Sequence, residues 1–346
     1  MKAVVVHAAG DLRIDNLPEP VPGPGEVLLA VEWGGICGSD LAYVAHGLSG
    51  TAELKHPMVL GHEFAGRVIA VGDDVDETLV GQAAAAYPPT LVGDGAMPER
   101  LAGRTNLYPS VRYFGSAALD PHTDGGFAAL KVIRADQIIA LPDGVDTRLG
   151  AIVEPLAVAL HAVRRAADLV PGGVVDRDIL VNGAGPIGLL AVVAAKRLGA
   201  ASVTAADLSP KALAIATAVG ADETVDVSSA PFSREYEIVI EASGAPQALG
   251  SVLRATARGG VVVQVGNLPA AEISAVLGDL VTREITWGGS FRFVDEMTEA
   301  VQLLADGLNV EPILTHDFSI DEAIDAFAVA ADRSTGSSKV MLNLAE

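Results

Sequence analysis

Residues 178–199 read DILVNGAGPIGLLAVVAAKRLG, and this stretch decides the fold of the second half of the chain. Its first residues form a continuous apolar run, as expected for a strand that is covered on both faces. Gly183, Gly185 and Gly188 follow in the spacing G-x-G-x-x-G, and a helical segment begins directly after the turn. The next predicted strand, SVTAAD, ends on Asp207. A strand, this turn, a helix and that acid together predict a dinucleotide-binding unit.

Each glycine has a separate expected role in binding a dinucleotide. The alternative is that the segment is a plain strand-turn-helix that binds no ligand. Gly183 permits the tight bend, Gly185 lets backbone amides approach a pyrophosphate, and Gly188 lets the helix sit close to the strand. Asp207 is expected to accept hydrogen bonds from the adenosine ribose and to repel a 2′-phosphate, which favours NAD over NADP. The predicted cofactor-binding set is Gly183, Gly185, Pro186, Ile187, Gly188 and Asp207.

The pattern of predicted secondary structure changes near residue 150. Before it, short predicted strands are separated by Pro and Gly, which indicates a compact β-rich domain up to about Asp146. After it, the strands YEIVIEAS, GVVVQVG and EITWGG alternate with helical stretches, one of which begins at Ser209 and Pro210. The predicted class is therefore α/β, with a doubly wound parallel sheet in the second part.

Composition excludes several function classes. The 346 residues carry a formal net charge of −21, which argues against a nucleic-acid partner because phosphate binding needs a basic face. The longest apolar stretch, residues 179–195, is interrupted by Asn182, three glycines and Pro186, so no membrane span is expected. One cysteine excludes an internal disulfide framework and favours a reducing, cytoplasmic compartment.

That single cysteine lies in the glycine-rich stretch GGICGSDLAY, residues 34–43. A free cysteine is usually a small buried apolar residue, so a metal site needs further candidates. Cysteine, histidine and carboxylate are the ligand types that zinc prefers. Glu154 also fits the start of a helix, where a carboxylate is favoured in any case. The candidate zinc ligands are Cys37, His62, Glu63 and Glu154.

The motifs GICGSD, GHEFAGRV, EPLAV and GAGPIG, in this order, resemble the zinc-dependent medium-chain dehydrogenases over nearly the whole chain. The stretches at residues 112–127 and 288–301 look like the polyol branch, which includes sorbitol dehydrogenase, and within it L-idonate 5-dehydrogenase. The resemblance implies a GroES-like catalytic domain at residues 1–149 and 290–346 and a Rossmann NAD-binding domain at residues 150–289. It also implies a homotetramer or homodimer.

The resemblance assigns roles to the candidates. Cys37, His62 and Glu63 would hold one catalytic zinc, and Glu154 would be an alternate ligand or hold the zinc-bound water. Zinc would act as a Lewis acid on a substrate hydroxyl, and NAD would accept the hydride.

The chain departs from the family in two places. Ser39 and Tyr43 remain as hydroxyl groups expected near the metal, but Ala42 stands where relatives carry a relay histidine. His46 is a possible substitute, with a surface histidine or a water relay as the alternatives. Many relatives also hold a second, structural zinc with four cysteines, and the matching residues here cannot serve as such ligands, so we predict no structural zinc. These residues are Val92, Gly95, Pro98 and Tyr108.

Arg292 in SFRF matches an arginine of the polyol branch that reaches the substrate. A guanidinium grips a carboxylate in a bidentate manner, which favours a sugar acid such as L-idonate, oxidised to 5-keto-gluconate. An uncharged polyol such as sorbitol or xylitol is the first alternative substrate. For Arg292 itself, the alternative is a surface arginine on an edge strand with no role in substrate binding. A non-catalytic dinucleotide-binding protein is the remote alternative.

Overall fold

The computed structural model describes residues 1–345 and divides the chain into two compact units. Unit 1 holds Met1–Glu154, Met297–Gly307 and the residues from Leu314 onward, and unit 2 holds Pro155–Glu296 and Leu308–Ile313. The chain passes between the units at residues 154–155 and 296–297, where the sequence predicts boundaries at 149–150 and 289–290. The short return of residues 308–313 to unit 2 was not predicted.

Unit 2 contains a six-stranded sheet whose paired strands are all parallel, in the order β15-β14-β13-β16-β17-β18. Counted from β13, this is the order 3-2-1-4-5-6 of doubly wound dinucleotide-binding folds, so the predicted class is confirmed. The strand order reverses between β13 and β16. The strands are β13 (Asp178–Asn182), β14 (Ser202–Asp207), β15 (Glu223–Asp226), β16 (Tyr236–Glu241), β17 (Thr256–Gln264) and β18 (Thr286–Gly289).

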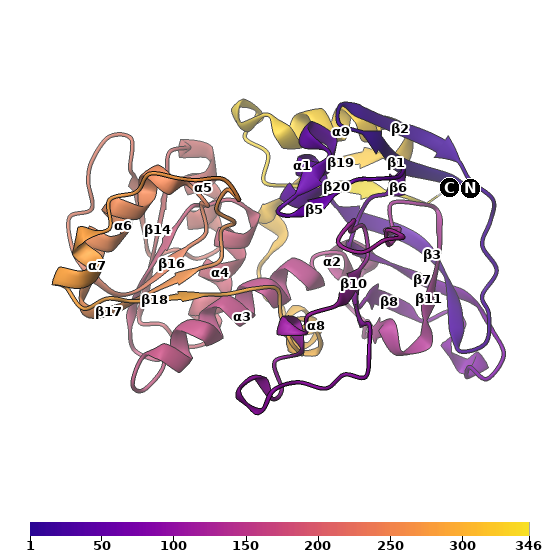
Figure 1. The fold of residues 1–346 in the computed structure, drawn as a ribbon, viewed down its shortest axis with the longest axis horizontal. Helices are drawn as coiled ribbons and strands as arrows, with labels where there is room; N and C mark the ends of the chain where they lie inside the picture. Colours follow the sequence, from indigo (N-terminus) through magenta and orange to yellow (C-terminus); the bar gives the residue numbers. More distant parts are fainter. Residues whose placement is uncertain (346) are drawn as a thin grey trace. The chain divides into compact units, whose positions relative to one another are not determined.

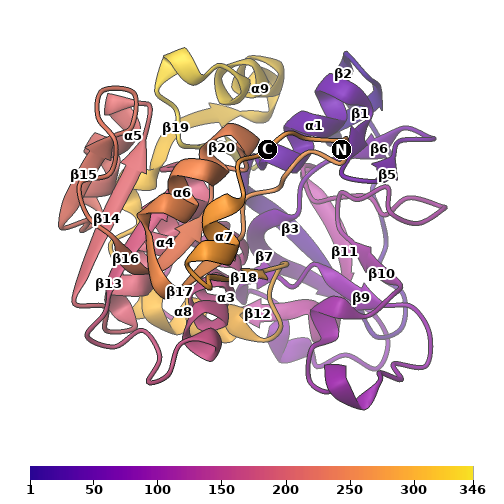
Figure 2. The same cartoon turned by 60° about the vertical axis from the view of Figure 1, so that its left-hand side comes forward.

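Helices cover this sheet and explain why its central strands, such as β13 and β16, are mostly apolar. Helix α4 (Pro186–Arg197) and α5 (Pro210–Ala218) contact the β13–β15 half, and α6 (Leu249–Ala255) contacts β16 and β17. In Figure 2, α6 and α7 (Gly278–Thr282) lie in front of the strands. The Ser209 hydroxyl accepts a hydrogen bond from the Ala212 amide at 3.3 Å, as the predicted N-cap of α5.

Unit 1 is built around a seven-stranded sheet in the order β12-β8-β7-β3-β20-β19, with β11 paired to β3. Strand β20, at the end of the chain, pairs with β3, near its beginning, and Figure 1 shows its yellow ribbon among the indigo strands. The strands are β3 (Glu26–Gly35), β7 (Glu63–Val71), β8 (Ala83–Ala86), β11 (Leu130–Arg134), β12 (Ile138–Ala140), β19 (Leu314–Ser319) and β20 (Lys339–Asn343). A smaller sheet holds β1 (Lys2–Ala8), β2 (Asp11–Asn16) and β6 (Met58–Val59).

The core of unit 1 is mostly aliphatic and spans both ends of the chain. Val27, Leu29 and Val31 alternate inward along β3, and Val340 and Leu342 do so along β20. This packing fixes the register of the strands that carry the candidate site, because a one-residue slip would turn every apolar side chain outward.

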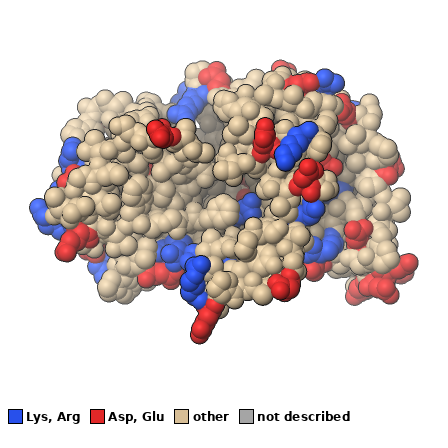
Figure 3. Space-filling view, in the orientation of Figure 1, with Lys and Arg blue, Asp and Glu red and all other residues tan. Residues whose placement is uncertain are grey.

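On the face drawn in Figure 3, basic side chains lie scattered among acidic ones. Among the described residues, no helix combines the length and the apolar character that crossing a membrane requires.

Candidate functional site

Strand register brings together residues that are far apart in the sequence. Gly35, the last residue of β3, pairs with Glu63 on one side and with Met341 on the other. Cys37 lies two residues beyond Gly35, and Lys339 opens β20. A Cβ at Gly35 would lie 2.6 Å from Glu63 Oε2 and 3.1 Å from the Lys339 side chain, so a larger residue here would have to displace this pair of side chains.

The structure brings Cys37, His62 and Glu63 into one cluster. One ligand atom from each (the thiol sulfur, an imidazole nitrogen and a carboxylate oxygen) lies within 4.8 Å of the other two. His62 and Glu63 are buried, and Cys37 is half-buried. This sulfur, nitrogen and oxygen set fits a catalytic zinc, which takes three protein ligands and leaves a position for another molecule.

Asp40 holds the backbone at Cys37 and at Gly61, the residue before His62. Its side chain is 0% exposed, and Oδ2 accepts a hydrogen bond from the Cys37 amide at 3.0 Å while Oδ1 accepts one from the Gly61 amide at 3.2 Å. Burial raises the pKa of Asp40, against the opposing charge of His62. Cys37 is the N-cap of α1 (Gly38–His46), so this carboxylate ties the helix start to the residue before His62.

The electrostatics of the cluster favour a cation. Burial by itself would lower the pKa of His62, but the charges of Cys37, Asp40 and Glu154 and a hydrogen bond with Cys37 raise it to about 10. The negative potential that holds a proton on the imidazole also favours a divalent ion among the same groups.

Lys339 forms a buried ion pair with Glu63. Its Nζ donates to Oε2 at 2.5 Å, to Oε1 at 2.8 Å and to the Ile36 carbonyl at 3.2 Å. Burial would lower the pKa of Lys339, but the charges of Glu63 and Cys37 outweigh it and raise the pKa. Both carboxylate oxygens thus accept from the ammonium, and each keeps lone pairs for a metal ion.

Glu154 lies outside the three-residue cluster. It stands in the first turn of α3 (Val153–Leu169) and accepts a hydrogen bond at 2.5 Å from the hydroxyl of Tyr113. The Tyr113 ring meets His62 edge to face, with 5.7 Å between ring centroids. Burial raises the pKa of Glu154, and the charge of His62 opposes this. Tyr113 therefore connects Glu154 to the cluster.

The remaining hydroxyl candidates of unit 1 differ in their surroundings. Ser39 lies half-buried in the first turn of α1. Tyr43 belongs to the hydrophobic core, 2% exposed, and its hydroxyl accepts a hydrogen bond from the Ala117 amide at 3.0 Å. His46 is exposed in the last turn of the same helix.

In unit 2, close contacts explain two of the three glycines of the dinucleotide turn. Gly183 has φ +98°, and a Cβ there would lie 2.6 Å from the Ser243 nitrogen. A Cβ at Gly188 would lie 1.8 Å from the Gly183 carbonyl oxygen. Gly185, the N-cap of α4, is exposed, and its Cβ would meet nothing within 4 Å. Packing therefore requires two of the glycines, and the third leaves open space at the helix N-terminus.

Asp207 reaches this turn from the end of β14. Its Oδ2 accepts from the Ala184 amide at 2.7 Å and its Oδ1 from the Ser209 amide at 2.9 Å. Each oxygen can accept one further hydrogen bond, as a ribose hydroxyl would require. Pro186 and Ile187, half-buried, form the first turn of α4.

Arg292 lies in unit 2, in the segment after the edge strand β18. It is half-buried, its guanidinium stacks on the Phe291 ring at 4.8 Å, and its φ is +53°. A left-handed backbone at a residue other than glycine is uncommon and persists where the surroundings impose it.

The lobe at residues 89–108 contains Val92, Gly95, Pro98 and Tyr108, the positions that the family resemblance matches to structural-zinc cysteines. Its base is a two-stranded pairing of β9 (Pro89–Leu91) with β10 (Val111–Tyr113), and the Tyr108 hydroxyl accepts from the Gly95 amide at 3.3 Å. Val92 is exposed, and Pro98 precedes a 3-10 turn. Because β10 ends on Tyr113, the lobe is connected to the Glu154 side of the site.

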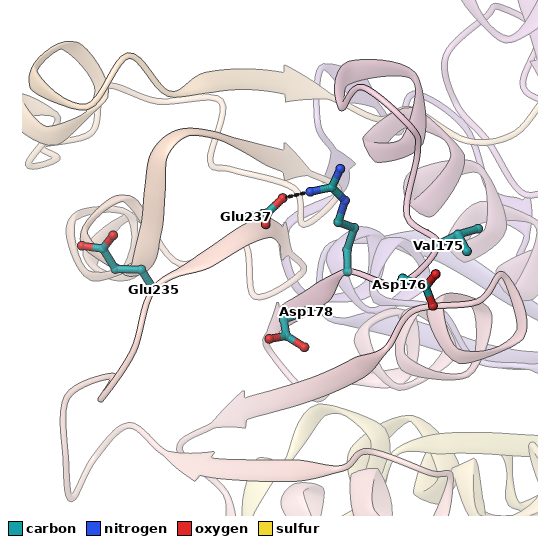
Figure 4. Close-up of a pocket in the computed structure, with 6 residues that line it drawn as sticks. Val175, Asp176, Asp178, Glu235 and Glu237 are labelled. Carbon is teal, nitrogen blue, oxygen red and sulfur yellow. Dashed lines mark hydrogen bonds and ion pairs between the residues drawn. The ribbon is translucent and has the colours of Figure 1, made fainter.

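A hollow of about 390 Å³ lies at the start of β13 and β16, which is the end of the unit 2 sheet opposite to the glycine turn (Figure 4). Arg177 forms an ion pair there with Glu237. None of the sequence-predicted site residues lines it; the lining residues are Val175, Asp176, Arg177, Asp178, Glu235 and Glu237.

Comparison with known proteins places both parts of the chain in one family. Residues 23–143 match the alcohol dehydrogenase GroES-like domain, and residues 186–306 match the zinc-binding dehydrogenase domain. Sorbitol dehydrogenase of Bos taurus is 38% identical over 341 residues, which cover 94% of this chain and 91% of that protein.

Two solved structures extend the comparison. L-idonate 5-dehydrogenase of Escherichia coli superposes with a TM-score of 0.90 at 34% identity, covering 99% of this chain and 97% of that one. A Sinorhizobium meliloti protein, assigned as a zinc-binding dehydrogenase and bound to NADP, gives 0.87 at 30% identity, covering 99% and 98%. The chain therefore belongs to the polyol branch of the zinc-dependent medium-chain dehydrogenase family.

Proposed function

We propose that the protein oxidises a secondary hydroxyl of a polyhydroxy compound with NAD as hydride acceptor. The observation that carries the proposal is the cluster of Cys37, His62 and Glu63, whose ligand atoms lie within 4.8 Å of one another. The sorbitol dehydrogenase relatives support a polyol as substrate.

In this proposal the chain's own residues organise the site. Zinc held by Cys37, His62 and Glu63, with Glu154 as an alternate ligand, would supply Lewis-acid polarisation of a substrate hydroxyl. Asp40 holds the backbone at Cys37 and Gly61, and Lys339 holds the Glu63 carboxylate. Ser39 is the hydroxyl at the helix start that could accept and pass on a proton, while Tyr43 is committed to the core.

The NAD preference is proposed from Asp207. Its two carboxylate oxygens already accept from backbone amides, so the charge is fixed next to the glycine turn. A 2′-phosphate there would meet this negative charge. The expected result is a kcat/KM for NAD⁺ at least tenfold above that for NADP⁺, at about 1.4 kcal/mol per tenfold step.

A sugar acid is the second candidate substrate, and Arg292 is the observation that favours it. Its guanidinium is half-buried against the Phe291 ring, 4.8 Å from the ring centre, and a guanidinium can bind a carboxylate in a bidentate manner. L-idonate 5-dehydrogenase is also among the structures that this chain superposes on.

A substrate panel tests both candidates. Zinc-loaded protein is assayed with NAD⁺ and NADP⁺ against sorbitol, xylitol, L-idonate and D-gluconate. If a sugar acid is the substrate, Arg292→Ala lowers kcat/KM for L-idonate by about 10- to 100-fold and for sorbitol by much less. Arg254→Ala, at an arginine that is 68% exposed, is the matched control. An equal loss for both substrates would remove the sugar-acid candidate, and no turnover of any panel member by zinc-loaded protein would contradict the proposal.

We also propose that the protein works as a homodimer or homotetramer in a reducing, cytoplasmic compartment. Among the described residues β18 pairs only with β17, so its outer edge is available to a second copy. Exposed apolar side chains flank it in sequence: Val276 at 64%, Val281 at 78% and Phe291 at 50%. Light scattering should give at least twice the chain mass, and Val281→Glu should lower it; a monomeric wild type would contradict the proposal.

A further inference from the structure

Glu241, the last residue of β16, is a buried carboxylate to which the proposed chemistry gives no role. Its side chain is 0% exposed, and burial raises its pKa. Its Oε1 accepts from the Ser243 amide at 2.8 Å, the Ser243 hydroxyl at 2.5 Å and the Gly244 amide at 2.9 Å. A carboxylate is costly to bury, and here four hydrogen-bond donors offset that cost.

The fourth donor comes from the neighbouring strand. Glu241 Oε2 accepts a hydrogen bond at 2.6 Å from the side-chain amide of Asn182, its register partner in β13. Asn182 directly precedes Gly183, the first glycine of the dinucleotide turn. One carboxylate therefore ties that turn to the turn after β16, which we call the Ser243 turn (residues 242–244).

The backbones of the two turns are in contact. A Cβ at Gly183 would lie 2.6 Å from the Ser243 nitrogen, so no side chain separates them. On the other side, a Cβ at Gly266 would lie 2.4 Å from the Gly244 nitrogen. The Ser243 turn is thus held between the ends of β13 and β17.

The position of the Ser243 turn in the sheet indicates what it faces. Ligands of doubly wound sheets bind beyond the carboxyl ends of the strands, where the strand order reverses. Here the order reverses between β13 and β16, and Asp207, for which ribose binding is proposed, lies on the β14 side. The adenosine half is therefore expected over β14, and the nicotinamide half over β16 and the Ser243 turn.

We propose that Glu241 is a positioning residue for the nicotinamide half of the dinucleotide, acting through Asn182 and the Ser243 turn. The proposal rests on the proposed function, because it requires that unit 2 binds NAD. It predicts that loss of the Asn182–Glu241 hydrogen bond weakens binding of the nicotinamide half more than binding of the ADP-ribose half.

A swap of donor and acceptor tests this. Asn182→Asp places two acceptors against each other, and Glu241→Gln places two amide donors there, whereas the double variant restores one donor and one acceptor. The full-length protein and the three variants are titrated with NADH and with ADP-ribose, and their thermal midpoints are measured. Glu237→Gln, on the same strand but at the opposite hollow, is the control.

Each single variant should weaken NADH binding about tenfold and ADP-ribose binding less than about threefold, and the double variant should recover NADH binding to within about threefold. Glu237→Gln should bind both ligands like the wild type. Equal losses for the two ligands, or no recovery in a folded double variant, would overturn the proposal. If Asn182→Asp does not fold, Glu241→Gln and the double variant decide. A wild type that binds neither ligand would instead overturn the proposed function, and this inference with it.

Discussion

The dinucleotide turn of unit 2 and the Cys37 cluster of unit 1 are built in opposite ways. The turn is formed by consecutive residues. Two of its glycines are required by close contacts, Gly183 with Ser243 after β16 and Gly188 with the Gly183 carbonyl. The cluster is assembled from β3, α1, β7 and β20, and its Lys339–Glu63 pair joins residues 276 positions apart. The turn should therefore depend on local backbone space, and the cluster on the balance of buried charge.

The largest effect is expected at the buried charges. Lys339→Met leaves Glu63 buried without its cation and should lower the free energy of unfolding of the metal-free protein by about 3–5 kcal/mol. Chemical denaturation of protein treated with a chelator measures this loss. Lys2→Met, at the exposed Lys2–Asp321 pair, should change it by no more than about 0.5 kcal/mol. Equal losses at both lysines would contradict a special role for buried charge.

The glycine turn separates stability from binding. Gly188→Ala forces a Cβ against the Gly183 carbonyl and should cost about 1–3 kcal/mol of stability. Gly185→Ala has open space and should stay within about 1 kcal/mol of the wild type. Its added methyl should still weaken NADH binding about tenfold, because it occupies the approach to the pyrophosphate. Thermal unfolding and NADH titration of both variants test the contrast, and a Gly185→Ala protein with full NADH affinity would break it.

The last contrast concerns a second lysine of unit 1, which donates to a backbone carbonyl rather than to a carboxylate. Lys131 donates to the Asp124 carbonyl at 2.7 Å and lies 5.1 Å from the Phe114 ring centre. Burial lowers its pKa from 10.5 to about 8, and the charge of Asp124 only partly opposes this. Between these pH values the unfolded chain binds the proton and the folded chain does not, so stability contributed at this site rises with pH.

The predicted rise of stability with pH can be measured by comparison with a variant that lacks the Lys131 amine. From pH 8 to 10.5, the wild type should gain stability relative to Lys131→Met, as followed by urea denaturation. If the difference in free energy of unfolding between the wild type and Lys131→Met stays constant from pH 8 to 10.5, the Lys131 ammonium is not desolvated in the folded protein.

The comparison also explains what could be predicted from the sequence. The doubly wound sheet followed from contiguous signals: apolar strands, the glycine turn and the Ser209 cap. Strand β15 was missed because it has only four residues, which are mostly polar and partly exposed. Cys37, His62 and Glu63 were predicted as residue types and by family resemblance, but their proximity depends on strand register.

Three residues that support the cluster were not predicted. Lys339 and Tyr113 reach it only through tertiary structure, and nothing in their local sequence marks them. Asp40 did carry a signal, since it stands three residues after the N-cap Cys37, the spacing of a capping box. Its second contact, to the Gly61 amide, could not be read from that spacing.

The most direct test of the account is metal binding by the thiol of Cys37. Metal-free protein is titrated with Co²⁺, and the near-ultraviolet thiolate-to-cobalt absorption is recorded for the wild type and for Cys37→Ser, with bound zinc per chain determined in parallel. We predict one ion per chain and a thiolate band that Cys37→Ser abolishes. Two tightly bound ions per chain, or equal ion content and spectra in both proteins, would contradict a single zinc held by the Cys37, His62 and Glu63 cluster.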